Sequence, residues 1–353
     1  MSVQPGNDPF SGSNTKNILQ HIISPKIVDT GSGAHAVKLD LINIDNISVT
    51  GNLSISSCEI KIGSDAGQTN QGDNSVAIGC QAGETNQGNN CVAIGLSAGE
   101  TNQSIGGTAI GQLAGQIDQG AYSVAIGFSA GQTNQAQYGI SVGSGAGFVN
   151  QGDNGVAIGR AAGSDNQGAG AVAIGKFAGS ENQTENSVAI GNNAGQTDQG
   201  DQSVAIGYNA GTTNQADFSV AVGSSAGQTN QGQFTTAVGN AAGQNDQGQG
   251  GVAVGTAAGT DVQGVGAVAI GNRAGFEGQG TNAIAIGQFA GQTGQHANSI
   301  VINATGTIFN TLSVSSFYVL PIRDLNGSGV GFKKLYYNPT TGEIAYDSTL
   351  AYP

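Results

Sequence analysis

Tryptophan is absent from this 353-residue chain, and only 9% of the residues are charged. Proline is scarce, and all six prolines lie outside residues 59–298. Glycine is abundant by contrast, with 61 copies. Such a composition excludes an ordinary globular core and leaves either a disordered low-complexity chain or a tightly repeating architecture. The glycines recur in register, which favours the repeating architecture.

Basic residues are also few. Ten Lys and Arg face 23 Asp and Glu, and the formal net charge is −13. A chain this acidic is repelled by phosphate backbones, so we expect no nucleic-acid partner. Residues 1–16 lack the basic stretch and apolar run of a secretory leader, and no segment approaches 18 apolar residues, so we expect neither a signal peptide nor membrane insertion.

The residues that usually carry chemistry are sparse. The three histidines are far apart in the sequence, and Cys58, Cys80 and Cys91 show no C-x-x-C spacing, which argues against a metal site. Acidic residues vary from copy to copy and form no fixed pair suited to acid-base catalysis. We therefore predict no catalytic residues, no cofactor and no enzymatic activity. The state of the three cysteines stays open.

A sixteen-residue repeat fills the middle of the chain. Gly63 is followed by a glycine every sixteen residues up to Gly287, which makes fifteen copies of the consensus V-A-I-G-x-x-A-G-x-T-N-Q-G-x-x-x without an insertion. One glycine, one alanine-glycine pair and one glutamine never vary. We expect these residues to form a structural ladder. In two copies they are Gly79, Ala82, Gly83 and Gln87, and Gly191, Ala194, Gly195 and Gln199.

The repeat predicts an all-β protein, a parallel β-solenoid of fifteen 16-residue coils. Sixteen residues are too few for a helix pair, whereas V-A-I alternates with the period of a strand, with Val and Ile on one face and Ala on the other. Each coil offers about one Val, one Ile and one Ala for burial. The glycines suit corners, and stacked glutamine amides suit a ladder of hydrogen bonds or a turn.

Four segments follow from the repeat. We assign 1–36 as an N-terminal anchor or leader, 37–58 as a β entry segment, 59–302 as the solenoid rod and 303–353 as a C-terminal β cap or tip. A short helix is expected at Asn14–Ile23, with Asn14 as its N-cap. In the last segment, Asn338–Gly342 has turn chemistry between two expected strands, Lys334–Tyr337 and Glu343–Tyr346.

The S-V-A-I-G-x-x-A-G pattern over residues 59–302 resembles the head repeats of trimeric autotransporter adhesins, whose repeats are usually slightly shorter. The resemblance implies a left-handed β-roll and a parallel homotrimer. A shared core also suits the modest apolar content of each coil. The order of the last segment is similar to fibre-like repeat proteins of large DNA viruses and to distal regions of phage tail fibres. The residues that carry this similarity are Ser299–Gly306, Phe317–Arg323 and Leu335–Ile344.

Three functions remain in competition. The leading hypothesis is a trimeric fibre or spike on the virion surface, joined to other virion proteins through its N-terminus and to a host-surface receptor or glycan through unknown tip residues. The first alternative is a cellular or secreted adhesin, found outside the cell or at its surface. The second is an ice-binding solenoid, because Thr-Asn recurs along one edge, although Ile117, Val149 and Asp165 interrupt it.

Overall fold

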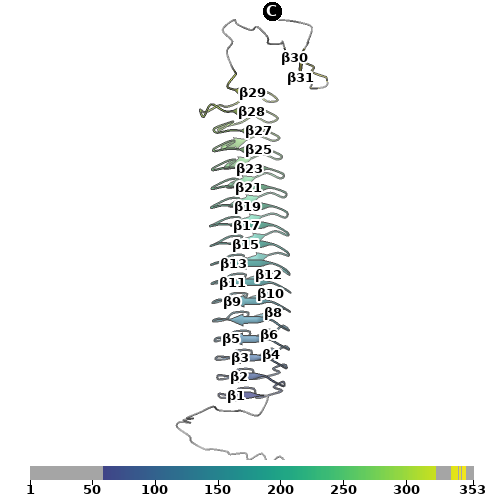
Figure 1. Ribbon diagram of the computed structural model, residues 1–353, viewed down its shortest axis with the longest axis vertical. Helices are drawn as coiled ribbons and strands as arrows, with labels where there is room; N and C mark the ends of the chain where they lie inside the picture. The colour runs from purple at the N-terminus through teal and green to yellow at the C-terminus, as the bar shows by residue number, and fades with distance from the viewer. Residues whose placement is uncertain (1–58, 323–334, 341, 343, 347–353) are drawn as a thin grey trace, which may run out of the picture. The chain divides into compact units, whose positions relative to one another are not determined.

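The computed structural model describes residues 59–322, 335–340, 342 and 344–346. All of them belong to one compact unit, which spans Ile55–Pro353. Figure 1 shows a column of stacked coils, each laid directly on the one before. The chain is therefore a parallel β-solenoid, as the repeat predicts. The described residues include no helix. Repeat positions are numbered 1–16 from the first residue of each V-A-I segment.

Sheet A runs the length of the column and is built from the V-A-I segments. Each strand pairs in parallel with the strand of the next coil, so that Val188, Ala189 and Ile190 oppose Val204, Ala205 and Ile206. Its 17 strands are β1 (Ile60–Ile62), β2 (Val76–Ile78), β3 (Val92–Ile94), β5 (Thr108–Ile110), β7 (Val124–Ile126), β9 (Ile140–Val142), β11 (Val156–Ile158), β13 (Val172–Ile174), β15 (Val188–Ile190), β17 (Val204–Ile206), β19 (Val220–Val222), β21 (Thr236–Val238), β23 (Val252–Val254), β25 (Val268–Ile270), β27 (Ile284–Ile286), β28 (Ile300–Asn303) and β29 (Phe317–Leu320).

Sheet B forms the opposite wall of each coil from the T-N-Q segments at positions 10–12. These strands also stack in parallel, sixteen residues apart, as in Thr197 opposite Thr213 and Gln199 opposite Gln215. The sequence analysis did not assign a strand to these segments. The 12 strands are β4 (Thr101–Gln103), β6 (Ile117–Gln119), β8 (Thr133–Gln135), β10 (Val149–Gln151), β12 (Asp165–Gln167), β14 (Glu181–Gln183), β16 (Thr197–Gln199), β18 (Thr213–Gln215), β20 (Thr229–Gln231), β22 (Asn245–Gln247), β24 (Asp261–Gln263) and β26 (Glu277–Gln279).

The core between the two sheets is made of small side chains and of glutamine. The alanines at positions 2 and 7 are buried, and all except Ala66 have no exposed surface, as with Ala189 and Ala194; Gln199 is equally buried. Our expectation that Val and Ile would join Ala in the core of each coil is therefore wrong. Ala at position 2 points inward, so Val and Ile at positions 1 and 3 point outward by the alternation of a strand.

Both ends of the described chain depart from the repeat. β28 and β29 continue sheet A past the last regular coil, and β29 lies in the segment expected to form the C-terminal cap. β30 (Leu335–Tyr337) and β31 (Ile344–Tyr346) pair antiparallel, which confirms the predicted hairpin. The expected segments 1–36 and 37–58, with the helix at Asn14–Ile23, lie outside the described residues.

Candidate functional site

The invariant glutamines line up in one row inside the column. All fifteen donate a hydrogen bond from Nε2 to the backbone carbonyl eleven residues earlier, as Gln199 does to Val188 at 2.9 Å. Nearly all also donate to the Oε1 atom of the next glutamine. Gln183 donates to Gln199 at 3.1 Å, and Gln199 donates to Gln215 at 3.3 Å. This glutamine column ties sheet A to sheet B within a coil and each coil to the next.

The glutamine column has a direction. Each amide N–H points toward the C-terminal neighbour and each Oε1 toward the N-terminal one, as in the bonds from Gln87 to Gln103 and from Gln103 to Gln119. Within the described residues, the buried Oε1 atoms of Gln87 and Gln231 have no partner, which marks breaks after Gln71 and after Gln215. Amides that stack in one direction polarise one another, so the column strengthens with length.

One serine interrupts the alanine core. Ser141 takes position 2 in its coil, and its hydroxyl donates to Gln151 Oε1 at 2.8 Å. Gln135 also contacts this hydroxyl, at 3.2 Å from Nε2 to Oγ. The buried alanines consequently fall into two clusters, one on each side of this level. The serine is fully buried, and its hydroxyl is hydrogen-bonded to glutamines of the column. It therefore extends the glutamine column and offers no free polar group for a ligand.

The invariant glycines are required by geometry. Gly191, at position 4, has φ +129°, and a Cβ atom there would lie 2.5 Å from the carbonyl oxygen of Gly207 in the next coil. Gly195, at position 8, has φ +51°, and its Cβ would lie 2.5 Å from Gln199 Oε1. Gly79 and Gly83 hold the same two positions in another coil, where a Cβ would meet the carbonyl oxygen of Gly95 and the side chain of Gln87. Only glycine permits coils to stack this closely over the glutamines.

A second amide column lies outside, at position 11 of sheet B. These residues have positive φ, near +58° for Asn102, a conformation that Asn and Asp tolerate better than most residues. Asn86 donates to Asn102 at 2.9 Å, and Asn102 donates to Asp118 at 2.8 Å. A run ends at each Asp because a carboxylate accepts hydrogen bonds and cannot pass one on. Further runs end at Asp198 and Asp246.

The outward face of sheet A is apolar along its whole length. In the fifteen coils, positions 1 and 3 hold only Val and Ile, apart from Thr108 and Thr236. The Val side chains are half-buried, whereas most of the Ile side chains at position 3 are more exposed, as with Ile190 at 36% and Ile270 at 39%. At the strand spacing, this face measures roughly 70 Å by 10 Å, or about 700 Å². A patch of this size usually marks an interaction surface.

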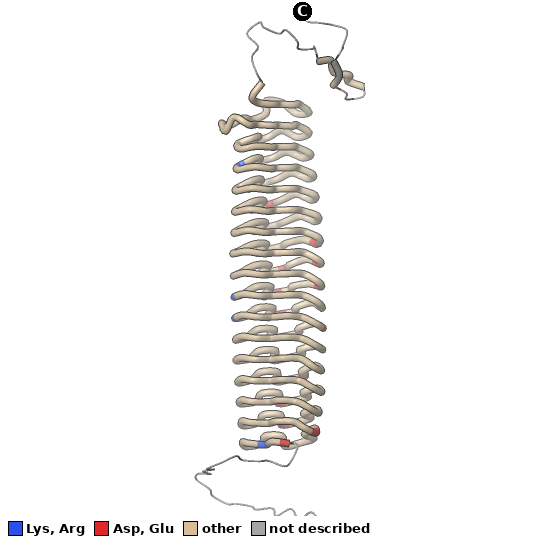
Figure 2. Tube along the Cα trace, in the orientation of Figure 1, with Lys and Arg blue, Asp and Glu red and all other residues tan. Residues whose placement is uncertain are grey.

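Charges are segregated around each coil. Every acidic residue from Asp73 to Glu277 lies at position 9, 10, 11 or 14, on or beside sheet B. Over the same stretch the only bases are Arg160, Lys176 and Arg273, at positions 5 and 6 on the other turn. Figure 2 shows these bases on one edge of the column, away from the acidic residues. Sheet A's outward face therefore separates a basic edge from an acidic region.

An aromatic ring lies between two of the bases. The Cζ atom of Arg160 is 4.7 Å from the ring centroid of Phe177, and the Nζ atom of Lys176 is 5.1 Å from it. Both distances fall within the range of cation–π attraction. These contacts hold two like charges on neighbouring coils next to one ring.

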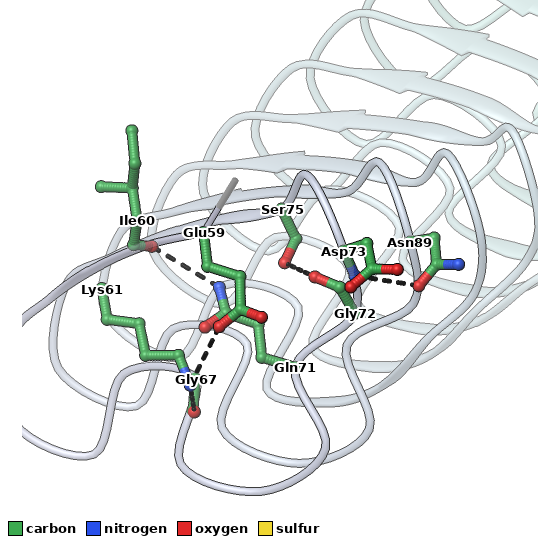
Figure 3. A network of polar contacts seen from close by, with 9 residues as sticks. All are labelled: Glu59, Ile60, Lys61, Gly67, Gln71, Gly72, Asp73, Ser75 and Asn89. Atoms are coloured by element: carbon green, nitrogen blue, oxygen red, sulfur yellow. Dashed lines mark hydrogen bonds and ion pairs between the residues drawn. The ribbon is translucent and has the colours of Figure 1, made fainter. Parts of the chain in front are cut away.

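The first coil is closed by polar groups, which Figure 3 shows from close by. Lys61 stands at position 2, where later coils bury Ala, and its Nζ donates to the carbonyl oxygen of Gly67 at 2.7 Å. Glu59 lies 3.7 Å from the same Nζ. Gln71 begins the glutamine column by donating to the carbonyl oxygen of Ile60. A charged side chain over the open end of the core is what a terminal repeat needs for solubility.

The last rungs are closed by larger side chains. Val301 replaces Ala at position 2 and is fully buried, and Phe309 and Tyr318 pack against the same cluster. The two rings meet edge to face, with centroids 6.0 Å apart. Asn303, in the place of the strand glycine, donates to the carbonyl oxygens of Gln288 and Thr307. The column thus has chemically different ends.

The two described cysteines have different surroundings. Cys80 is exposed at position 5, whereas Cys91 is fully buried at position 16, with Sγ 3.0 Å from the carbonyl oxygen of Ser104. Burial raises the pKa of the Cys91 thiol. Both are free thiols, and Cys58 lies outside the described residues.

Within the described ranges, no three His, Cys, Asp or Glu side chains gather closely enough to hold a metal ion. In this part of the chain no helix has the length and apolar character to cross a bilayer. The sequence analysis missed the outward Val and Ile face as a site. The signal was present, because these positions hold Val or Ile in every copy apart from Thr108 and Thr236, while the neighbouring turns vary.

Comparison with known proteins gives one match. Residues 167–194 and 199–226 match the YadA head domain repeat, in two copies. The matched stretches lie within the solenoid and include Gln167, Ala194 and Gln199. No curated protein and no solved structure shows significant similarity to the chain. The chain therefore carries YadA-like head repeats, which agrees with the adhesin resemblance of its sequence.

Proposed function

We propose that this chain forms the rod of a parallel homotrimeric fibre exposed at a surface, with a mechanical rather than a catalytic role. The observation that carries the proposal is the outward face of sheet A. Apart from Thr108 and Thr236 it is apolar over fifteen coils, and most of its Ile side chains at position 3 remain more than one third exposed in the single chain, as at Ile190. Three such faces turned toward a common axis would bury one another.

The magnitudes favour association. Burying a whole Ile side chain is worth about 1.5–3 kcal/mol, so burying the exposed third is worth roughly 0.5–1 kcal/mol. Over fifteen coils, the Val and Ile columns together supply on the order of 10–20 kcal/mol per chain. Association costs about 4–15 kcal/mol in lost freedom of motion. Burial of the face is therefore of the size needed to offset the cost of association, which supports the proposal.

The match to YadA head repeats supports the number and direction of the chains, since the adhesins that resemble this sequence are parallel trimers. It also supports exposure at a surface. A stiff stack of hydrogen-bonded coils would hold a binding tip away from its base. The partners of the two ends follow from the same hypothesis, with the N-terminus as the anchor and the C-terminal end as the contact with a receptor or glycan.

Two settings fit such a fibre. A virion fibre or spike rests on the order of the C-terminal segment, including Phe317–Arg323, and would join other virion proteins. A cellular or secreted adhesin is favoured by the YadA-like repeats over residues 167–194 and 199–226. The neighbouring genes would separate them, because capsid genes point to the first setting and secretion genes to the second. The ice-binding alternative gains no support, since position 10 holds Asp165, Glu181 and Asp261.

The decisive experiment is the native mass by light scattering behind a sizing column. We expect three chains and elongated hydrodynamics for the natural protein. The variant Ile190→Asp with Ile206→Asp places two charges on the outward face of sheet A and should give monomers with unchanged circular dichroism, because both side chains are already outside the coil.

Asn214→Asp is the matched control, since it adds a charge at position 11, where other copies carry Asp. It should leave the mass at three chains. A monomeric natural protein, or a trimer that survives both charges on sheet A, would contradict the proposal.

A further inference from the structure

Two turns flank the strand of sheet A in every coil. Positions 5 and 6 follow it, and positions 14 and 15 come shortly before the next strand. We call them the turn-5 edge and the turn-15 edge. Their outward side chains vary between copies. Within one chain the two edges lie at opposite ends of the sheet A strand, so contact within the chain cannot explain a correlation between them.

Large apolar side chains occur on both edges at the same levels. Phe128 on the turn-5 edge shares a coil with Tyr138 on the turn-15 edge, and Tyr208 shares a coil with Phe218. All four side chains are about half exposed, from 45% for Phe218 to 57% for Tyr208. Two more coils show the same coincidence, Leu96 with Ile105 and Leu113 with Tyr122. Four large apolar residues lack such a counterpart, namely Phe177, Phe234, Val265 and Phe289.

Aromatic residues also stack along the turn-15 edge. The rings of Tyr122 and Tyr138 lie 5.6 Å apart and nearly parallel, as do those of Phe218 and Phe234 at 5.3 Å. These stacks explain why aromatic residues occur in adjacent coils of one edge. They do not explain Phe128 on the other edge. Because the chain climbs one coil in sixteen residues, Phe128 lies in height between Tyr122 and Tyr138.

Charge differs between the two edges. Lys176 on the turn-5 edge shares a coil with Glu185 on the turn-15 edge, whereas Arg160 and Arg273 have no acidic residue on the turn-15 edge of their own coils. Across the described coils the turn-15 edge has no base, and the turn-5 edge has no acid beyond Asp65 in the first coil. The two edges therefore carry charges of opposite sign, and both carry large apolar side chains.

In a ring of three identical chains, each contact joins two different patches of the surface. With sheet A turned toward the axis, the turn-5 edge of one chain faces the turn-15 edge of the next. We propose that these two edges form the seam between neighbouring chains, level for level and without stagger, with Phe128 of one chain packed on the Tyr122–Tyr138 stack of its neighbour. The seam rests on the trimer proposed above.

Cysteine crosslinking tests the seam directly. The three natural cysteines are replaced by Ser, and Phe128→Cys is combined with Tyr138→Cys. A short bismaleimide should then join neighbours into covalent trimers on a denaturing gel. The matched control combines Phe128→Cys with Asn186→Cys, which has the same repeat position three coils further on, and should give no crosslinked species. Each single variant should also stay uncrosslinked.

The native mass of each variant separates the two proposals. A trimer by mass in which Phe128→Cys and Tyr138→Cys do not crosslink overturns the seam and leaves the trimer standing. Crosslinks in a single variant, or in the Asn186→Cys control, overturn it as well, because like edges or shifted levels would then meet. A monomeric mass for the natural chain removes the trimer and the seam together.

A charge exchange provides an independent measurement that keeps the natural cysteines. Lys176→Glu and Glu185→Lys, made singly, should each lower the urea concentration at which the trimer dissociates. The double variant should recover most of that loss, because the pair is restored across the seam. If the losses simply add in the double variant, the two residues do not face each other and the seam is wrong.

Discussion

Replacing one buried glutamine measures how much the glutamine column contributes to the solenoid. The side chain of Gln199 is fully buried, bonds to Val188 and Gln215, and accepts from Gln183. Methionine has a similar length and no amide. The variant Gln199→Met therefore keeps the volume approximately and removes three hydrogen bonds.

The size of the effect follows from the groups left behind. The Oε1 atom of Gln215 loses its donor from Gln199, and the Val188 carbonyl and the Gln183 amide each lose one bond. A buried polar group without a partner costs about 1–3 kcal/mol. The apolar replacement offsets part of this, because the desolvated amide is gone. We expect a net destabilisation of about 2–4 kcal/mol at this coil.

Two measurements read out the change. Hydrogen exchange of the backbone amides in β14, β16 and β18 should speed up, since stability in a repeat array depends on neighbouring coils. The urea midpoint should fall as well. The matched control is Gln196→Met, the same substitution three residues away, where the side chain is only partly buried and shows no comparable amide contacts. It should change stability by no more than about 0.5 kcal/mol.

Equal effects of Gln199→Met and Gln196→Met would refute the reasoning. The invariance of the glutamine would then reflect the space at position 12 and not its hydrogen bonds. If the two variants differ only slightly in urea midpoint, the hydrogen-exchange pattern still distinguishes them. Loss of the Gln199 hydrogen bonds should speed exchange only in the coils on either side of Gln199.

Two further predictions concern single positions. Gly191→Ala should destabilise the solenoid by roughly 2 kcal/mol or more, because a Cβ there is strained at positive φ and clashes with the next coil. Gly250→Asn should cost less than about 0.5 kcal/mol, because a Cβ there meets nothing within 4 Å and other copies carry Asn at this position. Thermal unfolding of both variants checks this, and equal losses would show that close stacking is not what requires glycine. In a Cys58→Ser background, iodoacetamide should modify Cys80 quickly and Cys91 only after unfolding, since burial shields the Cys91 thiol and raises its pKa. Mass spectrometry of the native protein gives the result, and rapid labelling of Cys91 would show that its coil opens.

The solenoid can be predicted from the sequence because the pattern of residues repeats with a fixed period. Glycines such as Gly79 and Gly191 recur every sixteen residues without a gap, and sixteen residues are too few for a helix pair. The orientation of the strand was harder. Alternation shows that Val188 and Ile190 share a face, but it does not say whether that face lies inside or outside the coil. In ordinary globular proteins the larger apolar side chains are the ones that are buried, whereas here the small side chain of Ala189 is buried instead.

Sheet B escaped prediction for a different reason. In Thr197-Asp198-Gln199 the middle residue adopts a left-handed conformation, with φ +53° for Asp198, so the segment lacks the alternation that marks a strand. Propensity also misleads, because Asn and Asp are uncommon in strands. What the sequence did offer was the invariant glutamine, interpreted as a ladder or turn residue. The parallel pairing of strands in sheet A and in sheet B becomes visible only when the coils are stacked on one another.

Nearly every interface between regular coils of this rod is built from the same contacts, with Gly over Gly, Ala over Ala and Gln over Gln, and Ser141 is the one departure from Ala at position 2 between the first and the last coil. Inserting or deleting a whole repeat therefore creates no new kind of junction and leaves Lys61 and Val301 covering their own ends. In-frame recombination between repeats would change the rod by steps of about 4.8 Å. The length of the rod, and with it the distance between its two ends, can therefore change in evolution while the fold of the chain stays the same.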